Sequence, residues 1–349
     1  MPSIEINGRR IGADHPPYII AEISANHNGS LATALRLLEE AKSAGADAVK
    51  LQTYTPDTIT LKTDSEDFVI RGGLWDGRTL YDLYSQAHMP WEWHAPLFSR
   101  AREIGITIFS SPFDRTAVDL LQDLDTPAFK VASFEIVDLP LIRYVASKGK
   151  PMIMSTGMAN SDEIAEAVQA AREGGCEDIA LLHCVSGYPA PAEDYNLRTL
   201  VDMAERFGLV TGLSDHTLDN TTALASVVLG GCLVEKHFTL DRRAGGPDDS
   251  FSLEPGELAQ LCRSARDAWA ALGKVDYGLK ASERSNAKFR RSIYVVSDVR
   301  RGDKVTMDNV RTVRPGFGLA CKHLDEVLGQ EFQSDVCAGT ALTWSMVKP

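Results

Sequence analysis

Eight short apolar runs alternate with longer amphipathic stretches along most of the chain, and this repeat restricts the possible folds more than any other feature. The short runs are rich in Val and Ile, which favours buried strands, while the longer stretches have the apolar spacing of helices. The expected strands cover residues 18–24, 47–52, 106–111, 128–133, 151–156, 179–184, 209–214 and 232–238. Eight strand–helix repeats in about 250 residues predict an α/β fold, the closed parallel (β/α)8 or TIM barrel.

An open, doubly wound parallel sheet is the alternative fold for the same repeat. Sheets of that kind that bind dinucleotides carry a glycine-rich loop directly after the first strand. The residues after the first expected strand do not have this pattern. The barrel is therefore favoured.

An unusually long segment, Tyr54 to Pro90, separates the second expected strand from its helix. Such connections usually have about two to six residues. The segment contains RGGLWDGRTLYDLY, which is rich in Gly, Asp and aromatic residues. Long loops at the carboxyl end of a barrel strand often close over a substrate, so we expect a lid here, with a functionless insertion as the alternative.

The pattern changes after Trp269. A polar, basic stretch comes first, followed by short candidate strands with turn signals at RGD and PG and no long helix before HLDEVLG. Such a pattern is typical of a small β-rich domain. We therefore expect a barrel domain at 1–277, a linker at 278–291 and a β-rich domain at 292–349.

Charge and cysteine usage argue against several classes of protein. The chain of 349 residues has 36 basic and 48 acidic side chains and a formal net charge of −12, whereas nonspecific nucleic-acid binding needs clustered Lys and Arg. The six cysteines form no CxxC pair, which favours free thiols in a reducing compartment. No signal-peptide pattern and no apolar run near the about 20 residues that span a bilayer are visible, so we expect a soluble, cytoplasmic protein without membrane or nucleic-acid partners.

Polar side chains gather at the carboxyl ends of the expected strands, which is where barrel enzymes build their active sites. An apolar barrel core would not carry so many charged and hydroxyl groups. The set comprises Glu22, Asn26, His27, Lys50, Gln52, Ser110, Ser111, Lys130, Ser133, Glu135, Ser155, Thr156, His183, Ser186, Tyr188, Asp215, His216, Glu235, Lys236 and His237. We therefore expect an active site at this end of the barrel.

Two histidines, His216 and His237, follow neighbouring expected strands. Two imidazoles with open positions suit Zn, Mn or Fe, and water and substrate oxygens would complete the ligand shell. A metal held there would polarise a substrate carbonyl group. A structural role in the core is the alternative for each histidine.

Two lysines, Lys50 and Lys130, stand at strand ends together with the hydroxyls of Ser111, Ser133 and Ser155. Ammonium groups and hydroxyls in this combination form a cradle for an anion such as phosphate. From the residues alone, two alternatives stay open. A strand-end lysine with a lowered pKa can form a Schiff base, and a lysine can also serve only as the ion-pair partner of a nearby glutamate.

Nine segments in order along the chain resemble the sialic acid synthase family. They are AEISANHNG, VKLQ, FSSPFD, KVASFE, MSTGM, HCVSGYPAP, GLSDHT, EKHFT and GGPDDSFSLEP. The resemblance covers essentially the whole chain and implies a TIM barrel followed by a small antifreeze-like (SAF) domain. Enzymes of this family condense phosphoenolpyruvate with an amino sugar to give a nine-carbon keto acid.

Within that family, GGLWDGRTLYDLY followed by HMPWEWH is most similar to the pseudaminic acid synthases. Their sugar substrate is 2,4-diacetamido-2,4,6-trideoxy-L-altropyranose, which yields pseudaminic acid. The alternative implied by the same resemblance is N-acetylneuraminate or legionaminate synthesis from N-acetylmannosamine or a related sugar.

The resemblance also implies roles for individual residues. His216 and His237 match ligands of a divalent metal ion, Mn²⁺ or Mg²⁺. Glu135 matches a carboxylate near the reacting carbon, and Glu22 matches one that orients a catalytic water or the sugar. The residues matching the phosphoenolpyruvate site are Lys50, Ser111, Lys130, Ser133 and Ser155.

One residue departs from the family's pattern, and another matches a residue that makes a contact between subunits. Ser186 stands where sialic acid synthases have Asn, so its contact to phosphate has a shorter reach. Gln52, Tyr188 and Asp248 match residues that contact the sugar. Arg314, in RPGFG, matches an arginine that reaches into the barrel of the partner subunit, which implies a domain-swapped homodimer.

The implied reaction joins the alkene carbon of phosphoenolpyruvate to the open-chain sugar aldehyde. Water then adds at C2 and phosphate leaves with C–O cleavage, and both steps need proton transfer by Glu135 or Glu22. Two other classes remain as rivals. One is a sugar-binding or regulatory barrel without catalysis, and the other is a lyase that forms an imine with pyruvate.

Overall fold

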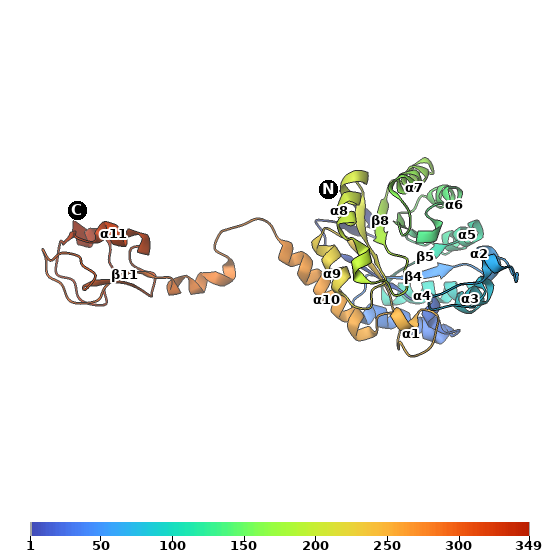
Figure 1. Cartoon of the computed structure of the whole chain (residues 1–349), viewed down its shortest axis with the longest axis horizontal. Helices are drawn as coiled ribbons and strands as arrows, with labels where there is room; N and C mark the ends of the chain where they lie inside the picture. Colours follow the sequence, from blue (N-terminus) through green and yellow to red (C-terminus); the bar gives the residue numbers. More distant parts are fainter. Residues whose placement is uncertain (1, 349) are drawn as a thin grey trace. The chain divides into compact units, whose positions relative to one another are not determined.

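Eight parallel strands close into a barrel in the computed structural model, which describes residues 2–348 (Figure 1). The ring closes between the last and first strands, where His237 pairs with Glu22. The strands are β3 (Tyr18–Glu22), β4 (Ala48–Thr53), β5 (Thr107–Pro112), β6 (Phe129–Val131), β7 (Met152–Ser155), β8 (Ile179–Cys184), β9 (Val210–Asp215) and β10 (Leu233–His237). The predicted (β/α)8 barrel is confirmed.

Helices surround the barrel (Figure 1). Particular residues mark where these helices begin and end. The main helices are α1 (Leu31–Ala44), α4 (His94–Ile104), α5 (Arg115–Asp123), α6 (Leu139–Ala146), α7 (Ser161–Glu173), α8 (Arg198–Phe207), α9 (Thr221–Val228) and α10 (Pro255–Leu272). At the start of α7, Asn160 accepts hydrogen bonds from backbone N–H groups while Glu163 accepts one from Asn160, which is a capping box. At the end of α1, Gly45 adopts a φ of 92°, the left-handed conformation that stops a helix.

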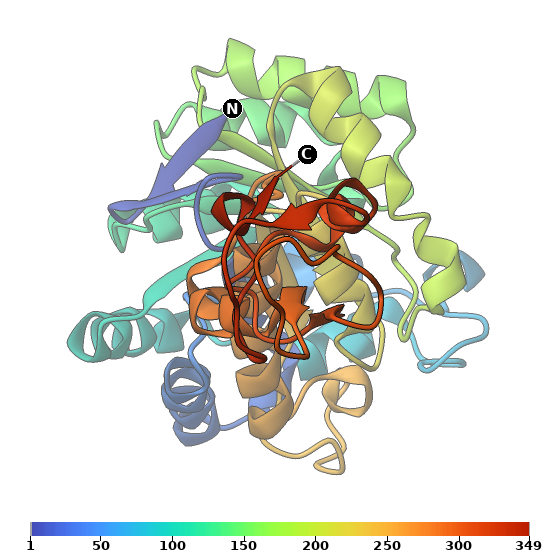
Figure 2. The same ribbon diagram turned by 90° about the vertical axis from the view of Figure 1, so that its left-hand side faces the viewer.

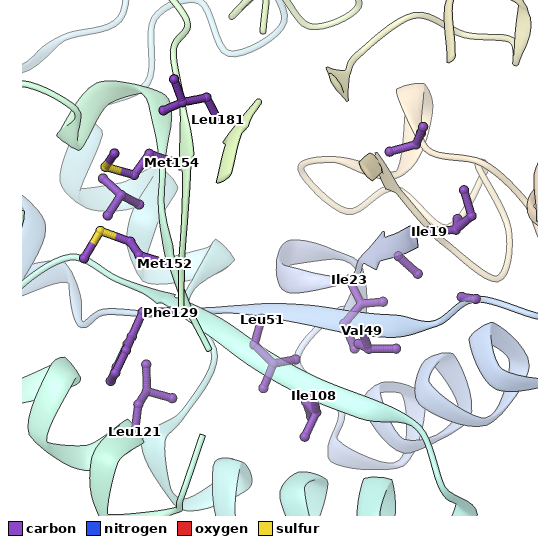
Figure 3. Close-up of a cluster of buried hydrophobic side chains, with 14 of the residues drawn as sticks. Ile19, Ile23, Val49, Leu51, Ile108, Leu121, Phe129, Met152, Met154 and Leu181 are labelled. Carbon is purple, nitrogen blue, oxygen red and sulfur yellow. The ribbon is translucent and has the colours of Figure 1, made fainter. Parts of the chain in front are cut away.

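Alternation along the strands decides which side chains fill the barrel. Ile19, Val49 and Leu51 belong to the large apolar layer between strands and helices, part of which is drawn in Figure 3. Tyr18 and Ile20, with the opposite orientation, belong to a separate apolar cluster inside the barrel. Because side chains alternate along a strand, the next inward positions toward the carboxyl ends carry polar groups. These positions include Glu22, Lys50, Ser111, Lys130, Ser155 and Glu235.

A short hairpin at the start of the chain packs against the apolar cluster inside the barrel. It consists of β1 (Ser3–Ile6) and β2 (Arg9–Gly12), joined by Asn7 and Gly8 with φ values of 51° and 77°. Its buried residues Ile4, Ile6 and Ile11 pack with the side chains at the amino-terminal halves of the barrel strands. The hairpin therefore covers the apolar end of the barrel and leaves the polar end for a site.

The long segment between β4 and α4 contains short helices and a turn. The helices are α2 (Pro56–Ile59), η2 (Glu66–Phe68), α3 (Leu80–Ala87) and η3 (Trp91–Trp93). Between η2 and α3, an antiparallel bridge joins Val69 to Thr79, the N–H of Ile70 donates to the carbonyl of Arg78, and the N–H of Gly77 donates to the carbonyl of Ile70. The segment thus has an ordered hairpin-like turn at the carboxyl end of β4.

The chain forms a second compact unit from Lys274 onward, with its own apolar core (Figure 2). Its elements are η7 (Ala281–Phe289), β11 (Ser292–Val295), β12 (Val310–Val313), η8 (Cys321–His323), α11 (Leu324–Val327), β13 (Glu331–Phe332), η9 (Trp344–Met346) and β14 (Val347–Lys348). The expected small domain with short strands is confirmed. The expected limits 1–277, 278–291 and 292–349 remain predictions, and η7 lies within the expected linker. Across residues 2–348, no helix combines the length and apolar character needed to cross a membrane.

Candidate active site

Lys50 lies between two carboxylates at the polar end of the barrel. Its Nζ is 2.8 Å from Glu22 Oε2 and 3.0 Å from Glu235 Oε1, and all three side chains are buried. The three residues come from adjacent strands, β4, β3 and β10. Burial acts to raise the pKa of Glu235, but the charges of Lys130 and Lys50 hold it below its usual value. The pairing of a lysine with a nearby glutamate, one of the alternatives that the sequence left open, is thus present at Lys50, and it fixes an ammonium group in the site.

Lys130 lies further around the ring, on β6. Its Nζ donates a hydrogen bond of 2.6 Å to Ser155 Oγ and one of 3.0 Å to the backbone carbonyl of Val131. Burial lowers the pKa of Lys130 to about 8, although the charge of Glu235 acts in the opposite direction. The lysine is therefore bound to one of the predicted serine hydroxyls.

Gly157 leaves a small hollow beside two more of the predicted hydroxyls. A methyl group at this position would collide with the Oγ atoms of both Ser133 and Ser186. The Oγ atoms of Ser186 and Ser111 are buried, and neither has a hydrogen-bond partner within residues 2–348. Buried hydroxyls without a partner normally mark a site for a bound group, because burial without a hydrogen bond is costly.

Glu135 lies in η4 (Ser133–Glu135), directly after β6. Burial raises the pKa of Glu135 to about 7, although the charges of Lys130 and Lys50 act to lower it. Its Oε2 atom is buried without a hydrogen-bond partner in the described part of the chain. A carboxyl group with a pKa near neutrality can both donate and accept a proton, which suits acid–base catalysis.

His216 and His237 lie side by side at the ends of β9 and β10, with ring centroids 5.5 Å apart. His216 Nδ1 donates a hydrogen bond of 2.8 Å to the carbonyl of Val185, which leaves Nε2 free of a proton when the ring is neutral. His237 Nδ1 is 3.5 Å from Asp248 Oδ2. The predicted pair is therefore brought together, with a carboxylate next to it.

The donor set of this pair fits a divalent cation. His237 Nδ1 is a buried nitrogen without a hydrogen-bond partner among residues 2–348, and burial holds the pKa of His237 well below its usual value. Neutral imidazoles and carboxylates are the ligands that first-row metals take in proteins. In the described chain, no group of three or more His, Cys, Asp or Glu side chains is placed to hold one metal ion. Substrate or water oxygens would therefore have to supply the remaining ligands.

Comparisons with known proteins assign this barrel to a family. The model of the NeuB family matches residues 37–277, and the model of the SAF domain matches residues 290–348. The chain belongs to the NeuB family. The resemblance to sialic acid synthases drawn from the sequence is thereby confirmed.

Several NeuB-family relatives match over nearly their whole length. The chain is 43% identical to "Pseudaminic acid synthase" of Campylobacter jejuni, over 94% of this chain and 96% of the relative. It is 34% identical to "N,N'-diacetyllegionaminic acid synthase" of Legionella pneumophila, over 99% of this chain and 98% of the relative. Among solved structures, the N-acetylneuraminic acid synthetase of Leptospira borgpetersenii, in complex with citrate, has a TM-score of 0.73 at 30% identity, covering 82% of this chain and 96% of that chain.

The remaining predicted site residues are divided between the barrel unit and the second unit. Gln52 is at the carboxyl end of β4, opposite Ser111 of β5. The Tyr188 ring lies 4.4 Å, centroid to centroid, from the His216 ring. Arg314 is exposed and follows β12 in the second unit, so its expected role in a partner's barrel stays a prediction.

Two of the polar residues expected at the strand ends, Asp215 and Lys236, support the NeuB-family site through contacts that were not predicted. Lys236 Nζ is 2.9 Å from Asp215 Oδ2 and donates a hydrogen bond of 2.8 Å to the carbonyl of Thr217, which fixes the loop that carries His216. The alternating pattern could have indicated this pair, since Lys236 must face away from its neighbours Glu235 and His237.

Asp249 fixes the loop that carries Asp248. Its carboxylate accepts hydrogen bonds of 2.7 Å from the N–H of Gly246, 3.1 Å from Asn28 Nδ2 and 2.5 Å from Thr239 Oγ1. Sequence reasoning had no signal for this contact, because Asn28 and Asp249 are far apart along the chain.

Proposed function

We propose that this chain is a pseudaminic acid synthase. It condenses phosphoenolpyruvate with 2,4-diacetamido-2,4,6-trideoxy-L-altropyranose and water, and the products are pseudaminic acid and phosphate. The observation that carries the proposal is the convergence of two lysines, unpartnered hydroxyls, Glu135 and a histidine pair at one end of a NeuB-family barrel. The choice of sugar is supported by the name and the 43% identity of the Campylobacter relative.

Phosphoenolpyruvate binds through its negative charges. Lys50 and Lys130 neutralise the carboxylate and phosphate, and the hydroxyls donate hydrogen bonds to their oxygens. The hydroxyls are those of Ser111, Ser133, Ser155 and Ser186. Gly157 keeps the space between Ser133 and Ser186 open for the phosphate. Ser186 has a shorter side chain than the Asn of sialic acid synthases, and its hydroxyl borders the space that Gly157 leaves open.

His216 and His237 would hold a divalent metal ion, Mn²⁺ or Mg²⁺. When bound, such an ion polarises the aldehyde oxygen of the open-chain sugar. Gln52, Tyr188 and Asp248 orient the sugar so that its C1 lies against C3 of phosphoenolpyruvate. A carbon–carbon bond then forms between C3 and C1, and the aldehyde oxygen takes up a proton.

Glu135 moves the protons of this reaction. Its pKa of about 7 lets the carboxyl group exist in both protonation states near neutral pH. Water adds at C2 of the pyruvyl unit, and the bond between C2 and the phosphate oxygen breaks, so that phosphate leaves and the C2 ketone remains. Glu22, held in place by the ammonium group of Lys50, orients the attacking water.

The proposed assembly is a homodimer in which Arg314 of one subunit completes the sugar site of the other. The SAF domain then acts as a lid for the neighbouring barrel. We place the protein in the cytoplasm, since its six cysteines are free and four of them are buried.

A competition experiment tests the sugar assignment. Limiting phosphoenolpyruvate is offered to the enzyme with equal concentrations of three sugars, and the product acids are separated against authentic standards. The sugars are the altrose-configured diacetamido sugar, N-acetylmannosamine and the legionaminate precursor. Pseudaminic acid is the expected main product. Mainly N-acetylneuraminate or legionaminate would keep the family chemistry and reject the proposed sugar.

A further inference from the structure

Trp75 stands out within the turn of the long segment between β4 and α4. Of the seven residues from Arg71 to Gly77, all of them described, Trp75 alone is not exposed. The turn is stiffened by backbone hydrogen bonds from Ile70 N–H to the Arg78 carbonyl and from Gly77 N–H to the Ile70 carbonyl, and by the Asp76 carboxylate, which accepts one from Gly72 N–H. A stiff turn with a single half-buried aromatic side chain holds that side chain in a fixed place.

Trp75 contacts the loops that carry two residues proposed to bind the sugar, Tyr188 and Asp248. Its Nε1 donates a hydrogen bond of 3.3 Å to the carbonyl of Pro247, the residue before Asp248. Its ring lies 5.8 Å, centroid to centroid, from the Tyr188 ring, which packs in turn on His216. Trp75 therefore bridges the two loops that carry Tyr188 and Asp248.

The aromatic neighbours extend this surface. Tyr188 also contacts Phe251, with ring centroids 5.3 Å apart, and Phe251 contacts His237 at 5.0 Å. Apolar and aromatic walls with a few placed polar groups are typical of small-molecule sites. The Trp75 indole is only partly buried, so its ring still has surface to offer to a ligand.

We propose that Trp75 is a specificity-determining residue that packs against the apolar groups of the bound sugar. The proposal rests on the proposed function, and it assigns to one residue the recognition of two groups of the proposed sugar. These groups are the methyl of the second acetamido group and the C6 methyl, where N-acetylmannosamine has a hydroxyl and a hydroxymethyl group. Covering these methyl groups with an aromatic ring removes apolar surface from water and favours binding. A hydroxyl covered by the same ring would lose its hydrogen bonds with water, which disfavours binding.

The test compares three variants of the full-length enzyme, Trp75→Ala, Trp75→Phe and Leu74→Ala. Leu74 is the exposed neighbour of Trp75 and serves as the matched control. For each variant, kcat and KM are measured for phosphoenolpyruvate, for the diacetamido sugar and for N-acetylmannosamine. Trp75→Ala is expected to lower kcat/KM for the diacetamido sugar by about 10- to 100-fold, the scale of one or two methyl contacts in an apolar pocket.

The other readouts separate recognition from a merely structural role. The KM for phosphoenolpyruvate stays within about twofold of wild type, and kcat/KM for N-acetylmannosamine falls less than that for the diacetamido sugar. Trp75→Phe retains most of the preference, because it keeps an aromatic ring against the methyl groups, although it loses part of the indole surface and the hydrogen bond to Pro247. Leu74→Ala behaves like wild type.

Two results would overturn the proposal. One is an unchanged preference between the two sugars in Trp75→Ala, and the other is an equal rise in KM for phosphoenolpyruvate and for the sugar. Failure of the proposed function has a different signature, since the wild-type enzyme would then not use the diacetamido sugar at all. In that case the same variants are compared on whichever sugars the wild type turns over, and an unchanged preference again rejects the role of Trp75.

Discussion

At the scale of single residues, the site depends on side chains whose charge is set by burial. Glu135 has a pKa raised to about 7 by burial, and Lys130 has one lowered to about 8 for the same reason. Lys50 is instead paired closely with Glu22 and Glu235. The proton chemistry is therefore assigned to Glu135, and the binding of anions to the two lysines.

Glu135→Gln is expected to lower kcat at least about 100-fold, because an amide cannot exchange protons and acid–base groups contribute on this scale. The measurement is turnover of phosphoenolpyruvate with the diacetamido sugar. Glu166→Gln on the exposed face of α7 removes a carboxylate of the same kind and is expected to leave turnover unchanged. Turnover near the wild-type value in Glu135→Gln would remove this residue from the mechanism.

The pH dependence of phosphoenolpyruvate capture follows from Lys130. The ammonium group carries its charge below its pKa of about 8 and loses it as the pH rises. Accordingly, kcat/KM for phosphoenolpyruvate, which reports groups of the free enzyme, is expected to fall about tenfold per pH unit above that value. In Lys130→Arg the charge persists, so this fall should disappear even if the absolute rate is lower. A profile that stays flat to pH 10 in the wild type would contradict the assignment.

Much of the site was predictable at this scale, and some of it was not. The polar residues could be assigned to the carboxyl ends of strands because their spacing from each apolar run is short and regular. The pairing of Lys50 with both Glu22 and Glu235 could not, because it depends on the register between β3, β4 and β10. These strands are parallel and joined by helices, so no tight turn in the sequence sets which residues stand side by side.

At the scale of elements, side chains alternate along each strand, so the proposed catalytic residues and the residues that hold them in place lie on opposite faces. On β10, Glu235 and His237 face the interior, whereas Lys236 faces the other way and pairs with Asp215 at the end of β9. The buried pair holds the His216 loop through the backbone of Thr217. The same strand ends thus carry the proposed metal ligand and its anchor.

Breaking this anchor is expected to destabilise the barrel. Lys236→Met leaves the buried Asp215 carboxylate without its cation, and such a loss costs about 3–5 kcal/mol. The free energy of unfolding, measured with urea, should fall by that amount. The double variant Lys236→Met/Asp215→Asn should recover most of the loss, because no charge is then left unpaired. A single variant as stable as wild type would show that the pair is not a structural anchor.

Elements with a strong hydrophobic period were predictable, whereas those specified by a few residues were not. The barrel strands have apolar runs that stand out from the helices between them, so all eight were found. The hairpin β1–β2 has strands of four residues each and was missed, although Asn7-Gly8 is a strong turn signal. Its position over the barrel interior is a tertiary contact that no local pattern encodes.

At the scale of the whole molecule, the proposal concerns two compact units, each with its own apolar core. The barrel unit ends at Gly273, and the SAF unit begins at Lys274 and has its own core. Arg314, at the end of β12, is exposed on the second unit. In the proposed dimer, its guanidinium lies in the sugar site of the partner subunit.

Mixing two inactive variants tests this exchange between subunits. In a dimer of Arg314→Ala with Glu135→Gln, one barrel has both an intact Glu135 and an intact Arg314 from its partner. After unfolding and refolding of an equal mixture, about a quarter of wild-type activity is expected, since half of the dimers are mixed and each has one complete site. Activity no higher than the mean of the two parents would reject an arginine supplied by the partner.

The most direct test of the central claim is phosphate release from phosphoenolpyruvate. The wild-type enzyme is assayed with the altrose-configured diacetamido sugar and Mn²⁺ or Mg²⁺, then without the sugar, and then after metal removal by EDTA. Phosphate release is expected to require the sugar, to stop with EDTA and to return when the metal is added back. Release without any sugar, or no release with any acetamido sugar, would contradict a synthase that joins these two substrates.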